Sequence, residues 1–248
     1  MTERRPPGIA HAFGDRRARI EAALSAGATM IEADLRFWQG QVWVRHERRM
    51  RFLPLLYNYR LGGVHREGPF AASIGSLWLR LDVRRMTFPE LLKRTAGQAG
   101  LLLDLKKDRY TRSTARGFVA TVLAEIEDAR FPGAVDFCGS WPLLDIVRSL
   151  KPAQAVHYAV DGPRDWERLL PRVANGAWSG GVSMRFNLIT PERLRILRGA
   201  GLEFYAWDVA DAAETERALE LGAAGIIGDD LDILGSLGRR PGRHSDAP

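Results

Sequence analysis

The chain has 248 residues, of which 46% are hydrophobic and 27% charged, and its formal net charge is +6. This composition is that of a globular protein rather than a disordered or fibrous one, and the length is close to the ~250 residues of a single (β/α)8 barrel. A single cysteine, Cys138, excludes an intramolecular disulfide framework and fits a reducing compartment. The positive charge favours acidic partners such as phosphates, anionic membranes or nucleic acid.

We expect both ends of the chain to lie outside the folded domain. Residues 1–8 are polar and contain proline without an apolar run, so we expect no secretory signal. No stretch is long and apolar enough to span a bilayer. Residues 239–248 are rich in Gly, Pro, Arg and Ser, which is typical of a disordered tail. We therefore predict a flexible N-terminus at 1–7, one soluble domain at 8–238 and a disordered tail, in a cytoplasmic protein.

The domain is predicted to open with a strand and a helix. Residues 8–11 form a short apolar strand. Asp15 is then expected to be the N-cap of a helix that runs to about Ala26, because a carboxylate can accept hydrogen bonds from the first free N–H groups. Gly27 is expected to end this helix, since glycine adopts the left-handed conformation without strain.

The next predicted strand, at 30–34, carries two acidic residues. Residues two apart in a strand point to the same side, so Glu32 and Asp34 should project together. Two carboxylates on one face of a short apolar strand repel each other and are costly to bury. The pattern therefore indicates either an edge strand with its polar face in water or a divalent-cation site, where oxygen ligands suit Mg²⁺ or Ca²⁺.

A turn at Gln39-Gly40 and a strand at 41–45 lead to His46, after which residues 47–100 have the least regular pattern. One interpretation is an insertion that packs its apolar residues on the domain. The other is a cationic, aromatic lip that meets phosphate head groups or a membrane surface. We expect no nucleic acid partner, because no recognisable nucleic-acid-binding module accompanies these residues. The insertion contains Arg48, Arg49, Arg51, Arg60, Arg66, Phe52, Leu53, Leu55, Leu56, Tyr57 and Tyr59.

Beyond residue 100, strands and helices alternate regularly. Together with the two N-terminal strands this gives roughly eight strands, which predicts a single (β/α)8 TIM barrel with an insertion between its second and third strands. A doubly wound open sheet is the alternative, but no glycine-rich dinucleotide fingerprint follows the first strand. The expected strands are 101–106, 134–140, 155–160, 181–186, 204–209 and 225–228, and the expected helices are 113–128, 142–150, 163–173, 190–201 and 211–222.

Polar residues recur where the predicted strands end, and active sites of such barrels lie at the carboxyl ends of the strands. Any one of these residues has a structural explanation, since a lone histidine or tryptophan more often packs than reacts. Their joint placement is what predicts a site. His65, His157 and His244 lie at no comparable position and are given no role. The candidate site residues are His11, Glu32, Asp34, Asp104, Lys106, Tyr205 and Trp207.

In combination these short motifs resemble the glycerophosphodiester phosphodiesterase superfamily. The resemblance runs from about Gly8 to Leu234 and rests on several short segments. Those segments are Ile9-Ala10-His11, Gly27-Ala28-Thr29-Met30-Ile31-Glu32-Ala33-Asp34, Val44-Arg45-His46, Leu103-Asp104-Leu105-Lys106, Tyr205-Ala206-Trp207 and Leu221-Gly222-Ala223-Ala224-Gly225-Ile226-Ile227-Gly228-Asp229.

The resemblance implies a metal-dependent phosphodiesterase acting on glycerophosphodiesters or related lysolipids, with one divalent cation, Mg²⁺ or Ca²⁺. The chemistry is consistent: a cation neutralises the phosphate charge, and two histidines titrating near neutrality can move the protons. In many relatives a hydroxyl of the substrate attacks and a cyclic phosphate forms, which stays open here. The implied roles are Glu32, Asp34 and Asp104 as metal ligands, His11 and His46 as the acid–base pair, Lys106 as a phosphate contact, and Tyr205 and Trp207 as further substrate contacts.

Three departures from the family pattern keep alternatives open. His11-Ala12-Phe13 stands where the family has His-Arg-Gly, Gly14-Asp15 replaces its Glu-Asn, and Asp104 replaces the commoner Glu. These features resemble the sphingomyelinase D/phospholipase D branch, which acts on choline-bearing lipids and lysolipids, although that branch's disulfide-bearing loop is absent. The alternatives are a lipid phosphodiesterase with peripheral membrane contact, or a non-catalytic barrel that binds phosphate or lipid. An arginine of the insertion could replace the missing phosphate contact. The sequence does not indicate an oligomeric state.

Overall fold

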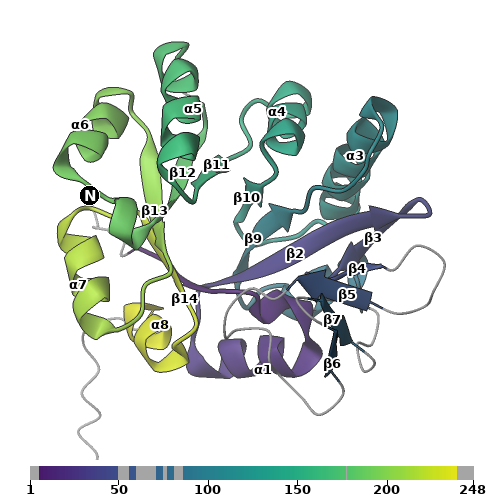
Figure 1. Cartoon of the computed structure of the whole chain (residues 1–248). Helices are drawn as coiled ribbons and strands as arrows, with labels where there is room; N and C mark the ends of the chain where they lie inside the picture. Colours follow the sequence, from purple (N-terminus) through teal and green to yellow (C-terminus); the bar gives the residue numbers. More distant parts are fainter. Residues whose placement is uncertain are drawn as a thin grey trace, which may run out of the picture.

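In the computed structural model, which describes residues 6–49, 56–59, 71–74, 77–80, 86–176 and 178–238, eight parallel strands close into a barrel (Figure 1). The first strand pairs with both the second and the last, which closes the barrel and confirms the predicted fold. The barrel strands are β1 (Gly8–Ala10), β2 (Met30–Trp38), β9 (Gly100–Leu105), β10 (Val135–Gly139), β11 (Val156–Val160), β12 (Gly180–Arg185), β13 (Glu203–Trp207) and β14 (Gly225–Gly228).

Helices surround this barrel (Figure 1), and the described residues form eight of them. Gly27 ends the first helix at φ 87°, as predicted. Side-chain caps begin two other helices: Thr190 accepts a hydrogen bond from Arg193 N, and Asp211 accepts one from Glu214 N. None of the helices in the described part of the chain is long and apolar enough to cross a membrane. The helices are α1 (Arg17–Ala26), α2 (Phe88–Thr95), α3 (Arg112–Asp128), α4 (Trp141–Leu150), α5 (Pro163–Ala174), α6 (Pro191–Gly199), α7 (Ala212–Glu220) and α8 (Leu231–Gly238).

Strand β2 is longer than predicted and continues past the barrel into a hairpin with β3 (Gln41–Val44). The turn lies at Gln39 and Gly40, as expected, and both have positive φ, which matches the twist of the two strands. A short strand, β8 (Met86–Thr87), pairs with β3. A second sheet, with β4 (Arg48–Arg49), β5 (Leu56–Tyr59), β7 (Leu77–Arg80) and β6 (Ala71–Ile74) in that order, lies beside this hairpin in Figure 1.

The region predicted as an irregular insertion therefore contains strands, and α2 lies inside its predicted limits. The lip hypothesis rests largely on residues outside the described part of the chain, so it stays a hypothesis. Also outside the described residues are 1–5 of the predicted N-terminus and all of the predicted tail, 239–248. The individual residues concerned are Arg51, Phe52, Leu53, Leu55, Arg60, His65, Arg66 and His244.

The N-cap prediction for Asp15 is wrong. Arg16 is the N-cap of α1 and has no side-chain hydrogen bond to the helix, while Asp15 ends a 3-10 turn, η1 (Phe13–Asp15). Its carboxylate accepts a hydrogen bond from the main-chain N of Asp34, at 2.9 Å, instead of from the helix. A tertiary contact with β2 thus replaces the local contact that the sequence indicated.

Two apolar cores determine which side chains face the site. The larger core lies between the strands and the helices, and the smaller lies inside the barrel. Along β9, Leu101, Leu103 and Leu105 belong to the outer core and Leu102 to the inner one, so alternation turns Asp104 inward with Leu102. The same alternation on β2 starts from the inward Met30. The inner core comprises Ile9, Met30, Leu102, Cys138, Tyr205 and Ile227.

Candidate functional site at the barrel mouth

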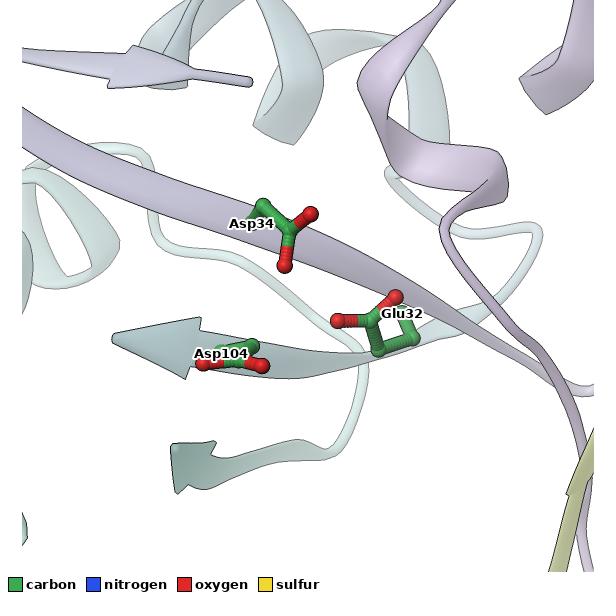
Figure 2. Close-up of side chains that lie close together, drawn as sticks. All are labelled: Glu32, Asp34 and Asp104. Carbon is green, nitrogen blue, oxygen red and sulfur yellow. The ribbon is translucent and has the colours of Figure 1, made fainter. Parts of the chain in front are cut away.

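Three carboxylates from two neighbouring strands converge inside the barrel. Glu32 and Asp34 lie on β2 and Asp104 lies on β9, and the parallel register sets Asp34 directly beside Asp104. Each residue offers one oxygen, and these oxygens lie within 4.8 Å of one another (Figure 2). Glu32 is 4% exposed and Asp34 is 1% exposed. The prediction that Glu32 and Asp34 share a side of their strand is thus confirmed, and they are buried rather than facing water.

Lys106 compensates part of this buried negative charge. Its Nζ lies 2.6 Å from Asp34 Oδ1 and 2.5 Å from Asp104 Oδ2. Burial alone would raise the pKa of Asp34, but the charges of Lys106 and His46 hold it below its usual range. Burial raises the pKa of Glu32 and of Asp104, and the charge of Asp34 adds to both shifts. One ammonium group therefore does not neutralise three buried carboxyl groups.

The donor set of this cluster fits a hard divalent cation. Asp34 Oδ2 and Asp104 Oδ1 are buried, and within the described residues neither has a hydrogen-bond partner. Buried carboxylate oxygens without donors are costly, and carboxylate oxygens are the ligands that Mg²⁺ and Ca²⁺ prefer. Glu32, Asp34 and Asp104 could therefore hold one cation, with Lys106 beside it.

The turn after β1 packs against β2, the strand that carries Glu32 and Asp34. Ala12 has φ 54°, and its main-chain N donates to Glu32 Oε2 at 2.5 Å. Gly14 packs so closely on β2 that a Cβ there would lie 2.3 Å from Ala33 Cβ, so a side chain would not fit. Burial, together with the charges of Asp34 and Glu32, raises the pKa of Asp15 well above its usual range. Sequence reasoning missed this role of Gly14 and Asp15.

His11 follows β1 at the mouth and is oriented by a carboxylate that the sequence analysis did not single out. Its Nδ1 lies 3.4 Å from Oδ1 of Asp229, the residue directly after β14. Although burial lowers the pKa of His11, the hydrogen bond to Asp229 and the charge of Glu32 raise it to about 9. Because Nδ1 faces Asp229, Nε2 is the ring nitrogen left for chemistry. The position of Asp229 after a strand, like that of His11, was the signal available in the sequence.

His46 approaches the same cluster from the segment after β3. Its charge is among the causes that lower the pKa of Asp34, so the ring lies within electrostatic reach of that carboxylate. Its main-chain carbonyl accepts two hydrogen bonds from the Arg36 guanidinium. The structure thus brings together the two predicted histidines, the three predicted carboxylates and Lys106.

The two aromatic residues predicted as substrate contacts occupy different depths. Tyr205 is 5% exposed in the inner core, where its hydroxyl donates to Asp136 Oδ2 at 2.5 Å and its ring stacks on His157. Trp207, two residues nearer the mouth, is half-buried, and the Arg185 guanidinium lies 4.6 Å above its ring. Trp207 is therefore placed to border a ligand at the mouth, whereas the Tyr205 hydroxyl already has a partner deeper in the barrel.

Comparisons with known proteins find no matching family model and no matching curated sequence, but solved structures match over nearly the whole chain. A candidate glycerophosphoryl diester phosphodiesterase from Silicibacter pomeroyi is 21% identical, with 93% of this chain and 92% of that chain covered and a TM-score of 0.69. A phosphodiesterase from Oleispira antarctica in complex with the product sn-glycerol-3-phosphate is 14% identical, with 94% and 96% covered and a TM-score of 0.66.

A third structure, a glycerophosphodiester phosphodiesterase from Parabacteroides distasonis, is 14% identical, with 94% of this chain and 98% of that chain covered and a TM-score of 0.61. At such low identity the shared feature is the path of the chain rather than the sequence. Neither chain in these pairs has large segments without a counterpart in the other. The chain therefore shares the (β/α)8 barrel fold of solved glycerophosphodiester phosphodiesterases.

Proposed function

We propose that this protein is a metal-dependent phosphodiesterase that hydrolyses glycerophosphodiesters or related lysolipids. The observation that carries the proposal is the convergence of Glu32, Asp34 and Asp104 with two histidines at one barrel mouth. The fold supports it, because the matching structures include phosphodiesterases, and one of these holds sn-glycerol-3-phosphate. A small phosphodiester is accordingly the substrate class that we propose.

The charge and position of each residue indicate its role in the proposed reaction. Glu32, Asp34 and Asp104 would hold a divalent cation, which would supply positive charge to offset that of the phosphate. Lys106 adds a second positive charge beside the same carboxylates. His46 acts as the base that takes a proton from the attacking oxygen. His11, whose pKa is raised by its hydrogen bond to Asp229, donates from Nε2 to the leaving alkoxide as the bond from phosphorus to that oxygen breaks.

The test is hydrolysis of a substrate panel with Mg²⁺, with Ca²⁺ and with chelator, followed by ³¹P NMR. The panel contains glycerophosphocholine, glycerophosphoethanolamine, lysophosphatidylcholine and sphingomyelin. We expect chelator-sensitive release of glycerol phosphate from the soluble diesters. Replacing His11 or His46 with Ala should lower kcat by at least about 100-fold, since each removes one proton-transfer group, while thermal unfolding stays cooperative. His157→Ala would not serve as a control, because His157 is buried against Tyr205.

The same panel separates the alternatives. Head-group release from the lipids alone, or a cyclic phosphate signal, would assign the protein to lipid-directed chemistry of the phospholipase D type. Binding of phosphate without turnover of any diester, in either metal, would favour a non-catalytic barrel. Near-normal turnover by the purified His11→Ala or His46→Ala variant would contradict the proposed acid–base roles.

A further inference from the structure

Arg36 follows Met30, Glu32 and Asp34 on the same side of β2, because side chains alternate along a strand. It is 5% exposed, which is unusual for an arginine. Its charge is among the causes that lower the pKa of Asp104, but its hydrogen bonds go elsewhere than to the three carboxylates. Burying a guanidinium is costly unless its donors are satisfied, so its hydrogen-bond partners indicate what it does.

Those partners are main-chain carbonyl groups of two segments that follow strands at the mouth. Arg36 Nε and Nη2 donate to His46 O, at 3.0 and 2.7 Å. Nη1 donates to Lys107 O at 3.4 Å and lies 3.8 Å from Asp108 Oδ2. One side chain thus links β2 to the segment with His46 and to the segment that begins next to Lys106.

The two hydrogen bonds from the Arg36 guanidinium to His46 O, referred to below as the fork, are the stronger part of this link. His46 lies between β3 and β4, outside both strands, and the main chain just before it is hydrogen-bonded to β2 from Arg45 N to Asp34 O, at 2.8 Å. Two donors in a planar group restrain both the position and the orientation of the carbonyl that they share. The restraint is anchored two residues from Asp34, in the part of β2 where Arg36 pairs with Trp43 of β3.

We propose that Arg36 is a positioning residue for His46, which it holds at a set distance from the carboxylate cluster. This inference rests on the proposed function for its effect on turnover, but the placement of His46 can be measured without substrate. A misplacement of about 1 Å at a catalytic group typically costs on the order of 100-fold in rate. Loss of the fork should therefore lower kcat far more than substrate or cation affinity.

The experiment compares Arg36→Lys and Arg36→Met with Arg172→Lys as a matched control. Lysine keeps the charge but cannot give one carbonyl two parallel hydrogen bonds, and methionine removes both features. Arg172 makes a comparable fork, to Asp145 at 2.6 and 2.9 Å, on the outer helices. The readouts are kcat and KM for the best diester, cation affinity by calorimetry, thermal unfolding, and the titration of the His46 ring by NMR without substrate.

We expect both Arg36 variants to lose roughly 10- to 100-fold in kcat, with KM and cation Kd within about threefold of wild type. We also expect an altered His46 ring titration, and no such changes in Arg172→Lys. If Arg36→Met does not fold, the Arg36→Lys variant alone tests whether Arg36 positions His46. Unchanged His46 titration in a folded Arg36 variant would overturn the inference, as would equal kcat losses in Arg36→Lys and Arg172→Lys. If wild type hydrolyses no diester, the proposed function fails and the NMR result alone decides the positioning role.

Discussion

At the scale of single residues, cationic side chains partly offset the negative charge of the carboxyl groups in the site. Lys106 contacts two of the three carboxylates directly, and His11 and His46 act on them through their charge. Asp229 stands on the other side of His11 and raises its pKa. The proton that His11 carries therefore depends on its acidic neighbours as much as on the imidazole itself.

The variant Asp229→Asn tests this dependence. Asparagine keeps an oxygen that can accept from Nδ1 but lacks the negative charge, so the pKa of His11 should fall from about 9. If His11 must be protonated, activity on the basic side of the pH–kcat/KM profile should be lost at lower pH than in wild type. Asp232→Asn, at an exposed position in α8, is the charge-matched control. If Asp229→Asn loses activity at the same basic pH as wild type, His11 is not the acid.

At the scale of elements, the strand ends are shaped to make room for the carboxylates. Gly139, the last residue of β10, pairs with Leu105 and has φ 99°. A Cβ at this position would lie 2.0 Å from Asp104 Oδ1 and 2.9 Å from the main chain of Leu105. The absence of a side chain at Gly139 thus leaves the space on the β10 side that Asp104 Oδ1 occupies.

Gly139→Ala should therefore perturb both the backbone and the ligand set. The left-handed conformation costs an L-residue about 1–2 kcal/mol, and the displaced Asp104 should weaken cation affinity by roughly 10- to 100-fold. Gly117→Ala, inside α3 with open space around it, is the matched control and should raise the unfolding free energy by about 0.5–1 kcal/mol. Calorimetric titration and denaturant unfolding provide the two measurements. Wild-type cation affinity in Gly139→Ala would show that Asp104 does not need this space.

At the scale of the whole molecule, the closed barrel buries a charged cluster in its interior, so stability should depend on pH and on cations. In the cation-free protein the raised pKa of His11 contributes stability below its ordinary value of 6.5, and this contribution is lost as pH rises through about 9. The raised pKa of Glu32 acts in the same direction, because the unfolded chain releases that proton at lower pH.

We expect the Tm with chelator to fall as pH rises from about 6.5 to 9, and added Mg²⁺ or Ca²⁺ to offset the fall. At roughly 100 times its Kd a cation adds about 2.7 kcal/mol, which raises Tm by roughly 5–10 °C for a domain of this size. The rise should be largest at high pH, where cations no longer compete with protons for the carboxylates. Scanning calorimetry of wild type and Asp34→Asn measures it. An equal cation-induced rise in both proteins would exclude Asp34 as a ligand.

The barrel architecture and most of the candidate site follow from local patterns in the sequence. Alternating apolar strands and capped helices predicted the barrel, because burial periodicity is a local property of the chain. Period-two alternation likewise predicted that Glu32 and Asp34 share one side, and the fold confirms both predictions. The strand-end rule was sufficient to place His11, Asp104 and Lys106 at one mouth.

The partners that these residues take follow instead from the way the strands pack together. Asp15 has the local signature of an N-cap, but β2 offers its carboxylate a buried N–H from Asp34, and the distant contact replaces the local one. Asp229 and Arg36 act through His11 and His46, which lie on other strands or segments, so no spacing along the chain reveals those pairs. The physical reason is that barrel closure sets neighbours by register between strands, and register follows from packing of the whole core rather than from any short stretch of sequence.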